Sequence, residues 1–302
     1  MGRWQTAHAT ASDELMDTVA RLTAAAEALA AVGTRARAQA EGLPVPEAVA
    51  ERLDAVCAAL GVDVAAVDPD RLAIAAAGIR AFFLQAGDLL ADPARAPGWT
   101  YTDAAVLENQ GRLSAVIAER IAALAPQLDG LALDRPGAAV CDVGAGIAAL
   151  SVALCRRWPA LRVVGLEPWE PAMRLAAATV AASEVADRIE LRAARVEDLA
   201  DRDAFDAIWL PLPFLAPAAV PAGLRRCLEA LRPGGWMLAG LYAAPADPLA
   251  SALVDLRTVR SGGRPYTPAE AARLLAQAGY AAVAALERQG QAPVRFVVGR
   301  RP

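Results

Sequence analysis

The chain has 302 residues, of which 56% are hydrophobic and 21% charged, so it can bury a sizeable core and lacks the composition of a disordered protein. Its formal net charge is −4 and it contains no block of basic residues. This argues against a nucleic-acid partner held by phosphate contacts and against a basic patch for membrane surfaces. We therefore expect neither nucleic acid nor a membrane as a partner.

The cysteines and the N-terminal stretch narrow the class of protein further. No two cysteines form a CxxC pair and no histidine lies near them in the sequence, so we expect neither a metal site nor a disulfide framework. Acidic residues interrupt the first apolar stretch, which therefore does not resemble the core of a signal peptide. These features predict a cytoplasmic protein with isolated, buried thiols at Cys57, Cys141, Cys155 and Cys227.

Helical patterns follow one another from residue 12 to about residue 130. A proline or a capping residue opens each of them, and a glycine ends the second. We expect residues 1–130 to form a helical domain that closes over the substrate as a lid and offers a surface for a homodimer. The predicted helices cover residues 12–40 and 46–61, a stretch from 68 onward, and a stretch from 102 or 103 to about 128.

From residue 137 the pattern changes to short apolar strands that alternate with helices, which is typical of a parallel α/β sheet. We expect residues 131–302 to form a Rossmann-like α/β domain. Its seven-stranded, doubly wound sheet would be mostly parallel, with the last strand antiparallel. The predicted strands are 138–143, 161–167, 188–193, 205–210, 236–242, 280–287 and 294–298, and helices begin near residues 148, 170, 218 and 268.

The segment Asp142-Val143-Gly144-Ala145-Gly146 joins the first predicted strand to a helix and allows two interpretations. Glycines suit such a turn because they adopt unusual backbone dihedrals and let a ligand approach the backbone. With Ala149 they also fit the GxGxxG/A pattern of dinucleotide-binding proteins, in which Glu167 would bind the ribose. Asp142 argues against that interpretation, because a carboxylate there would repel a pyrophosphate. It suits S-adenosylmethionine, which carries an ammonium and a sulfonium and no phosphate.

The loop resembles motif I of the class I S-adenosylmethionine-dependent methyltransferases, (D/E)xGxGxG, with Ala148 in place of the third glycine. Three further segments are similar to the same family in order and spacing: the strand end at Glu167, the acidic pair after the third strand, and the turn Pro233-Gly234-Gly235 before the fifth. The resemblance implies S-adenosylmethionine as the cofactor. It also implies the cofactor-binding residues Asp142, Gly144, Ala145, Gly146, Glu167, Pro168, Glu197, Asp198, Leu210, Tyr101 and Gln110.

The family resemblance assigns roles to some of these residues, and each role has an alternative. The acid that ends the second strand accepts hydrogen bonds from both ribose hydroxyls, a role that falls to Glu167 unless it only caps the next helix. Glu197 and Asp198 would lie against the adenine amino group, but an acidic pair also opens helices in general. Upstream, Tyr101 and Gln110 resemble a segment that closes over the methionine end of the cofactor, although an amphipathic linker helix has the same pattern.

The sequence says less about the acceptor. Methyl transfer from a sulfonium is a direct displacement, so the protein mainly aligns the reactants and excludes water. We assign no catalytic residue, since the sole histidine, His8, lies near the N-terminus. The apolar, proline-rich segment after the fourth strand favours an apolar or aromatic small-molecule acceptor lined by Trp209, Phe214 and Tyr266, with core packing as the alternative for Trp209. A flexible basic loop is expected around Arg257, Arg260 and Arg264.

The leading prediction is therefore a methyltransferase that acts on a small metabolite of the natural-product type. The Ala, Arg and Pro content resembles that of proteins from high-GC bacteria. One alternative is a protein of the methyltransferase fold that binds the cofactor without transferring a methyl group. Another is an NAD(P)-dependent oxidoreductase, which is disfavoured because a sequence without lysine holds no catalytic Tyr-xxx-Lys pair.

Overall fold

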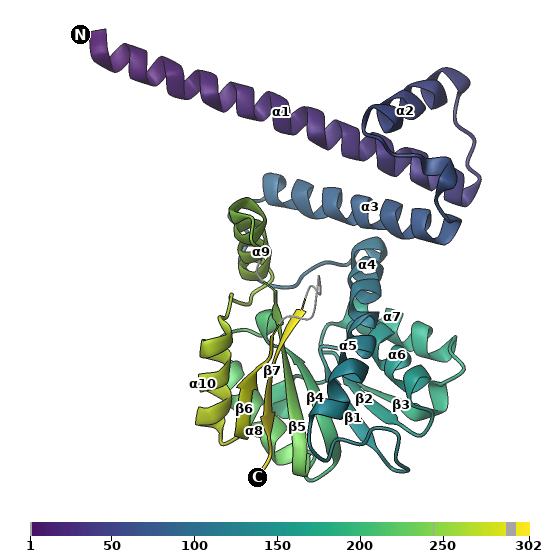
Figure 1. Ribbon diagram of the computed structural model, residues 1–302, viewed down its shortest axis with the longest axis vertical. Helices are drawn as coiled ribbons and strands as arrows, with labels where there is room; N and C mark the ends of the chain where they lie inside the picture. Colours follow the sequence, from purple (N-terminus) through teal and green to yellow (C-terminus); the bar gives the residue numbers. More distant parts are fainter. Residues whose placement is uncertain (1, 244, 288–293) are drawn as a thin grey trace. The chain divides into compact units, whose positions relative to one another are not determined.

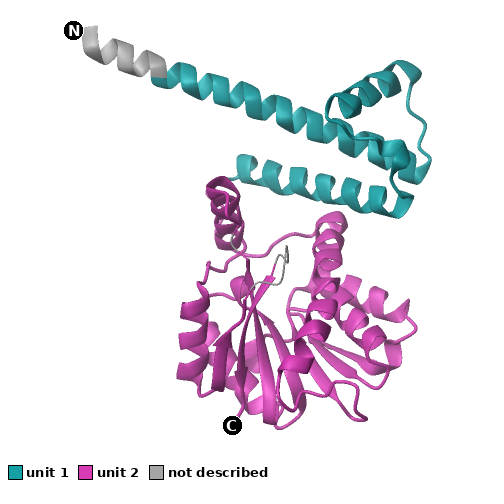
Figure 2. Ribbon diagram, viewed as in Figure 1, with its two compact units in different colours: residues 1–93 teal, residues 94–302 magenta. Residues whose placement is uncertain are grey.

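The computed structural model describes residues 2–243, 245–287 and 294–302, with side chains from residue 11 onward. The chain divides into two compact units, residues 1–93 and 94–302 (Figure 2). The division lies ahead of the boundary at residue 130 suggested by the sequence, because the helices between these positions pack on the unit that contains the sheet. The lid and dimer roles expected of the helical part stay predictions.

The first unit is helical: α1 (Gly2–Glu41), α2 (Glu47–Ala59) and α3 (Pro69–Ala91), with a short 3-10 turn, η1 (Val64–Ala66). Helices α2 and α3 begin beside the prolines that predicted them, and Asp68 caps α3 by accepting backbone N–H groups. The core of the unit gathers at the C-terminal half of α1, where Gly33 lets the Ile79 side chain approach the helix. Its buried members are Ala36, Cys57, Val64, Leu72 and Ala76.

Helix α3 is long and apolar enough to cross a membrane by length and composition alone, with a mean hydropathy of 1.4 over its most apolar window. Arg80 lies midway along it, and the helix packs along α1 within the unit. Core helices of soluble proteins pass the same test, so α3 by itself does not identify a membrane protein.

Two helices lead into the sheet of the second unit, α4 (Ala104–Ala115) and α5 (Ile117–Leu124), followed by η2 (Ala125–Gln127). The sequence predicted one continuous helix here, but the helix is interrupted at Val116. Both pieces pack on α6 (Ala149–Arg157), and α5 contributes Ile117, Ile121 and Leu124 to the core beneath.

Within the described residues, seven strands form one sheet in the order β3-β2-β1-β4-β5-β7-β6 (Figure 1). Neighbouring strands are parallel except where β7 pairs antiparallel with β5 and β6. The predicted doubly wound sheet with an antiparallel last strand is therefore confirmed. The strands are β1 (Ala139–Val143), β2 (Arg162–Leu166), β3 (Ile189–Arg192), β4 (Phe205–Pro211), β5 (Leu231–Tyr242), β6 (Ala281–Ala285) and β7 (Val294–Arg300).

Helices cover both faces of the sheet (Figure 1). Helices α5, α6 and α7 (Glu170–Ala181) bury one core, and α8 (Val220–Ala230) and α10 (Pro268–Ala278) bury the other. Successive side chains of a strand point to opposite faces, so Val140 of β1 joins the first core and Cys141 and Val143 join the second. Short 3-10 turns complete the connections: η3 (Ala186–Arg188), η4 (Val196–Asp198) and η5 (Leu212–Phe214).

Helix α9 (Pro248–Arg260) was not expected from the sequence. Asp247 caps it by accepting the backbone N–H of Ala250 at 2.7 Å, and a proline occupies its first turn. Arg257 and Arg260 therefore lie in its last turn, and the prediction of a flexible basic loop is wrong for these two residues.

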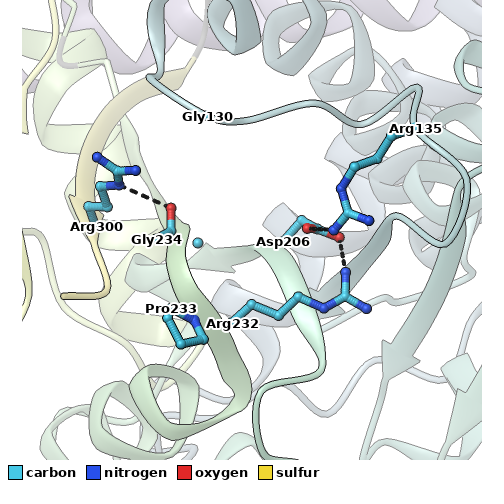
Figure 3. Close-up of a pocket in the computed structure, with 8 residues that line it drawn as sticks. Gly130, Arg135, Asp206, Arg232, Pro233, Gly234 and Arg300 are labelled. Carbon is cyan, nitrogen blue, oxygen red and sulfur yellow. Dashed lines mark hydrogen bonds and ion pairs between the residues drawn. The ribbon is translucent and has the colours of Figure 1, made fainter.

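A polar pocket of about 220 Å³ lies where β4 begins (Figure 3). Arg135 and Arg232 approach the carboxylate of Asp206 from two sides and donate to it. Across the pocket, Arg300 donates from Nε to the carbonyl of Gly234 at 3.1 Å. These bonds join the segment before β1 to β4, and β5 to β7, at the amino ends of the parallel strands. The predicted cofactor loop lies at the carboxyl ends.

Candidate active site

The strand order reverses between β1 and β4, which pair at the centre of the sheet. In doubly wound sheets, ligands bind outside the carboxyl ends of the strands at such a switch point. Parallel strands end on the same side, so the loops that follow β1, β2 and β4 share this edge. The candidate site is therefore built from residues after Val143, Leu166 and Pro211.

The glycine loop after β1 has a backbone conformation that side chains disfavour. Gly144 and Gly146 have φ values of 68° and 58°, and Ala148 adopts a left-handed conformation as well, with φ 62°. The N–H of Ala145 donates to the carbonyl of Leu166 at 2.9 Å, which holds the loop on β2. A Cβ added to Gly146 would meet nothing within 4 Å, so the backbone is open to a ligand at this position.

Glu167 follows β2, and its carboxylate is turned toward the glycine loop. Oε2 accepts the N–H of Gly146 at 2.9 Å and Oε1 accepts the N–H of Trp169 at 2.8 Å. Burial raises the pKa of Glu167, and the two N–H donors oppose that rise. A carboxylate offers about four lone-pair positions, so each oxygen keeps one for a further donor. Because Trp169 is the N-cap of α7, Glu167 supports that helix start and still keeps acceptor positions for a ligand.

Asp142 lies beneath the loop, in β1, and is 1% exposed. Its Oδ2 accepts the hydroxyl of Ser151, in the first turn of α6, at 2.6 Å. Burial raises the pKa of Asp142 to about 7, the Ser151 bond opposes the rise, and the charge of Glu167 adds to it. Asp142 is therefore enclosed beneath the glycine loop, with the Ser151 hydroxyl as its hydrogen-bond partner. Ser151, which sequence reasoning missed, could have been found as a polar residue on the buried face of the first helix after the loop.

Residues 140–235, from β1 into β5, match a family model described as a methyltransferase domain. The match covers the glycine loop, Glu167 and the acidic pair after β3 in one continuous segment. By this match, residues 140–235 carry a methyltransferase domain. No curated protein sequence matches the chain.

Solved structures of methyltransferases share the fold over nearly the whole length of the chain. PigF with SAH matches with a TM-score of 0.68 at 21% identity, over 94% of this chain and 99% of that chain. The S-adenosylmethionine-dependent methyltransferase SibL, in its apo form, matches with 0.65 at 19% identity over 94% and 99%. Mitomycin 7-O-methyltransferase MmcR matches with 0.64 at 22% identity over 98% and 100%. These likenesses show that the chain has the fold of these methyltransferases.

Helix α4 packs on the glycine loop of the methyltransferase domain at Gly111. A Cβ at Gly111 would lie 2.3 Å from Cγ1 of Ile147, so this approach requires glycine. Tyr101 packs in the same apolar cluster as Ile147, and its carbonyl accepts the Nε1–H of Trp169 at 2.8 Å. The segment that carries Tyr101 and Gln110 therefore lies against the loop and against the start of α7.

The residues expected near the adenine lie along the same edge of the sheet. Pro168 is exposed directly after Glu167. Glu197 is half-buried and Asp198 is exposed in η4, which follows β3, the neighbour of β2. Their positions agree with the order of segments that the sequence suggested.

Two predicted site residues lie in the core instead. Leu210 is fully buried among the side chains on the α8 face of the sheet, so its side chain cannot contact a cofactor. Trp209 is 6% exposed and packs edge-on against Phe296, with ring centroids 5.6 Å apart, where Gly240 leaves room for the indole. Trp209 therefore follows the alternative of core packing, because β4 is covered on both faces.

Four aromatic rings form a row beside the carboxyl ends of the strands, and we call them the aromatic row. Trp99 lies 5.2 Å from Tyr101 and 6.1 Å from Phe214, which lies 5.8 Å from Tyr242, all between ring centroids. Phe214 and Tyr242 follow or end the adjacent strands β4 and β5, which places them on the cofactor side. Sequence reasoning missed Tyr242, whose signal was its place at the end of the fifth strand.

The loop after α9 is pinned against this row. The N–H of Gly98 donates to the carbonyl of Arg260 at 2.9 Å. A Cβ on Gly263 would lie 1.6 Å from the carbonyl oxygen of Pro213, so the loop touches η5 through its backbone. Tyr266 lies apart from the row, packed on the α8 side of the sheet with the Arg264 guanidinium 3.9 Å from its ring centroid.

Proposed function

We propose that the protein is an S-adenosylmethionine-dependent methyltransferase that methylates a small, apolar or aromatic molecule. The observation that carries the proposal is the pairing of Glu167 with the glycine loop at the switch point of a methyltransferase domain. Two carboxylates, Asp142 and Glu167, lie beside an open glycine backbone, which suits a cofactor with cationic centres better than one with a pyrophosphate.

The residues of the crevice fit the cofactor part by part. The free lone pairs of Glu167 would accept the two ribose hydroxyls, and Pro168 would border the adenine. The acidic side chains of η4, Glu197 and Asp198, would accept from its amino group. Gly144, Ala145 and Gly146 would let the cofactor approach the backbone, and the segment with Tyr101 and Gln110 would meet its methionine end. Asp142, in its ionised form, would favour the cationic groups from beneath the loop.

The cofactor supplies a methyl group on a sulfonium, ready for direct displacement. The chain has then to hold the acceptor in line and keep water away. The aromatic row fits this task, because Trp99, Phe214 and Tyr242 offer ring faces and edges to a planar acceptor on the cofactor side of the sheet. The likeness to a mitomycin 7-O-methyltransferase supports an acceptor of natural-product size.

Calorimetry with S-adenosylhomocysteine and with NADH tests the cofactor assignment. We expect micromolar binding of the first and none of the second, and the reverse result would overturn the proposal. Incubation with methyl-labelled cofactor and a panel of phenolic and quinone acceptors then tests the reaction. Label must appear in a product, whereas cofactor binding without transfer to any acceptor would favour a protein that only binds the cofactor.

A Phe214→Ala variant tests the acceptor side separately. We expect a higher KM for the acceptor with unchanged affinity for S-adenosylhomocysteine, because Phe214 belongs to the aromatic row and not to the glycine loop. An unchanged KM would remove the aromatic row from the acceptor site.

A further inference from the structure

The aromatic row ends at a side chain that carries a hydroxyl group. Tyr242, the last residue of β5, is 37% exposed, and its ring centroid lies 5.8 Å from that of Phe214. Burial raises the pKa of Tyr242 to about 12, so its hydroxyl keeps its proton at neutral pH. No group of the described residues accepts a hydrogen bond from this hydroxyl. The end of the row therefore offers a donor to a ligand.

Helix α9 brings a positive charge to the same end of the row. It follows β5 and lies at the carboxyl ends of the parallel strands (Figure 1). The N–H of Gly263 donates to the carbonyl of Thr258 at 3.2 Å, and Gly263 lies against the backbone of η5. The N–H of Gly98, just before the row, donates to the carbonyl of Arg260. These contacts hold the last turn of α9, which contains Arg257, beside the row.

The charge of Arg257 acts on the hydroxyl of Tyr242. The guanidinium opposes the rise in the pKa of Tyr242 that burial causes, and such an effect weakens with distance, so the two groups lie near each other. Within the part of the chain that the structure describes, neither a hydrogen bond between these two side chains nor an acid paired with Arg257 is present. Both side chains can therefore donate to a third group.

The end of a helix does not by itself explain this arrangement. Arginines in a last turn interact favourably with the helix dipole, and α6 ends in the same way with Arg156 and Arg157. There, Arg156 pairs with the exposed carboxylate of Glu184 at 2.8 Å. Arg257 differs because its charge lies beside a hydroxyl donor at the end of an aromatic row. Two donors at one place favour an anion as the group that they bind.

We propose that Arg257 and the Tyr242 hydroxyl bind a carboxylate on the acceptor, so that the enzyme prefers aromatic acceptors that carry one. This inference rests on the proposed function. The planar fork of a guanidinium fits both oxygens of a carboxylate, and the rings of the row would hold the aromatic part. In the strand order, β5 lies two strands from β1. Neighbouring strands are about 4.8 Å apart, so the carboxylate would lie roughly 10 Å from the strand that leads into the glycine loop.

Calorimetry of the full chain, saturated with S-adenosylhomocysteine, tests this preference. The probes are matched pairs of phenols in which a carboxamide replaces the carboxylate: hydroxybenzoate and hydroxybenzamide, hydroxynaphthoate and hydroxynaphthamide, and a hydroxyanthraquinone carboxylate and its carboxamide. We expect the carboxylate of at least one pair to bind roughly tenfold more tightly, the factor that a hydrogen bond to a charged group contributes. Equal affinities in every pair, or binding of none of the probes, would overturn the proposal.

Three variants assign the preference to these side chains. Arg257→Gln should abolish the difference within a pair, and Tyr242→Phe, which keeps the ring, should reduce it. Arg264→Gln is the matched control and should retain the full difference, because that guanidinium lies over Tyr266 and pairs with Glu270. Equal weakening of both members of a pair in Arg257→Gln would indicate a structural role and contradict the proposal.

The cofactor distinguishes a failure of this inference from a failure of the proposed function. If the chain does not bind S-adenosylhomocysteine, the proposed function is wrong. If the chain binds it and transfers labelled methyl equally well to phenols with and without a carboxylate, the proposed function stands and only the carboxylate site is rejected.

Discussion

Two acids lie beside the glycine loop but differ in what surrounds them. Glu167 faces the glycine loop with its carboxylate held by two N–H groups, and it retains acceptor capacity for further donors. Asp142 is enclosed under the loop with one hydroxyl partner, Ser151. Burial raises the pKa of both. The first therefore suits direct contact with a ligand, and the second couples the stability of the domain to pH.

Replacing Asp142 with Asn should remove a pH dependence of stability. The carboxyl group ionises near pH ~3.9 in the unfolded chain, and its pKa in the folded protein is about 7. Between these values the folded state keeps a proton that the unfolded state has lost, so the free energy of unfolding falls as the pH rises. The fall from this group amounts to at most ~4 kcal/mol.

Denaturant unfolding at about pH 5 and about pH 8 measures the free energy of unfolding at two pH values that span most of this change. The loss of stability between the two pH values should be clearly smaller in Asp142→Asn than in the unaltered protein. An equal loss in both would show that Asp142 does not titrate in this range.

Glu167→Gln should weaken binding of S-adenosylhomocysteine by about 1–3 kcal/mol. Glutamine has one acceptor oxygen where glutamate has two, so its NH₂ group would face the N–H of Gly146 or of Trp169. Glu170→Gln is the matched control, because that side chain is exposed and pairs with Arg174 at 2.9 Å. Calorimetry measures the affinity of both variants for S-adenosylhomocysteine. Equal affinities would show that Glu167 does not bind the cofactor.

At the scale of elements, the position of α4 depends on one glycine. Gly111→Ala would push a methyl group into Ile147 of the glycine loop and should lower the free energy of unfolding by about 1–3 kcal/mol. Gly87→Ala in α3, a helical position where an added Cβ meets nothing within 4 Å, should instead raise stability by up to ~1 kcal/mol.

A second substitution identifies the contact. Ile147→Ala should recover part of the stability lost in Gly111→Ala, because it removes the side chain that the new methyl group meets. Denaturant unfolding of the single and double variants gives the coupling energy. Additive effects would mean that α4 and the loop do not press on each other at this point.

At the amino ends of the parallel strands, several hydrogen bonds converge on the carboxylate of Asp206. Asp206 accepts from Arg135, from Arg232 and from the N–H of Ala139 at 2.8 Å, so Asp206→Ala should cost about 2 kcal/mol of stability. Glu184→Ala, which removes an exposed pair with Arg156, should cost less than ~1 kcal/mol. Binding of S-adenosylhomocysteine should survive both changes, and its loss in Asp206→Ala would show that the two edges are coupled.

At the scale of the whole molecule, the two units have separate cores. The two large clusters that sandwich the sheet draw only on residues from 117 onward, and the small cluster of the first unit only on residues 32–76. A chain that begins at Ala94 should therefore fold cooperatively and bind S-adenosylhomocysteine.

Circular dichroism melting measures the folding of this fragment, and calorimetry measures its binding of S-adenosylhomocysteine. Failure of the fragment to melt cooperatively would mean that the first unit contributes to the stability of the second.

The sequence by itself determined the features that depend on neighbouring residues. Strand and helix alternation after residue 137, the glycine turn, and the acid after β2 are local patterns, and they predicted the sheet and the class of domain. The sequence also predicted the helix starts at Pro46 and Asp68, because a capping residue acts within one turn of the helix.

Only the tertiary structure decided what depends on contacts between distant segments. The boundary at residue 93, the burial of Trp209 and Leu210, and the hydroxyl partner of Asp142 follow from which surfaces meet. The aromatic row has the same origin, because Trp99, Phe214 and Tyr242 come from three separate segments. A periodic pattern gives the face on which a side chain lies, but the packing of the other elements determines whether that face meets solvent, a ligand or the core.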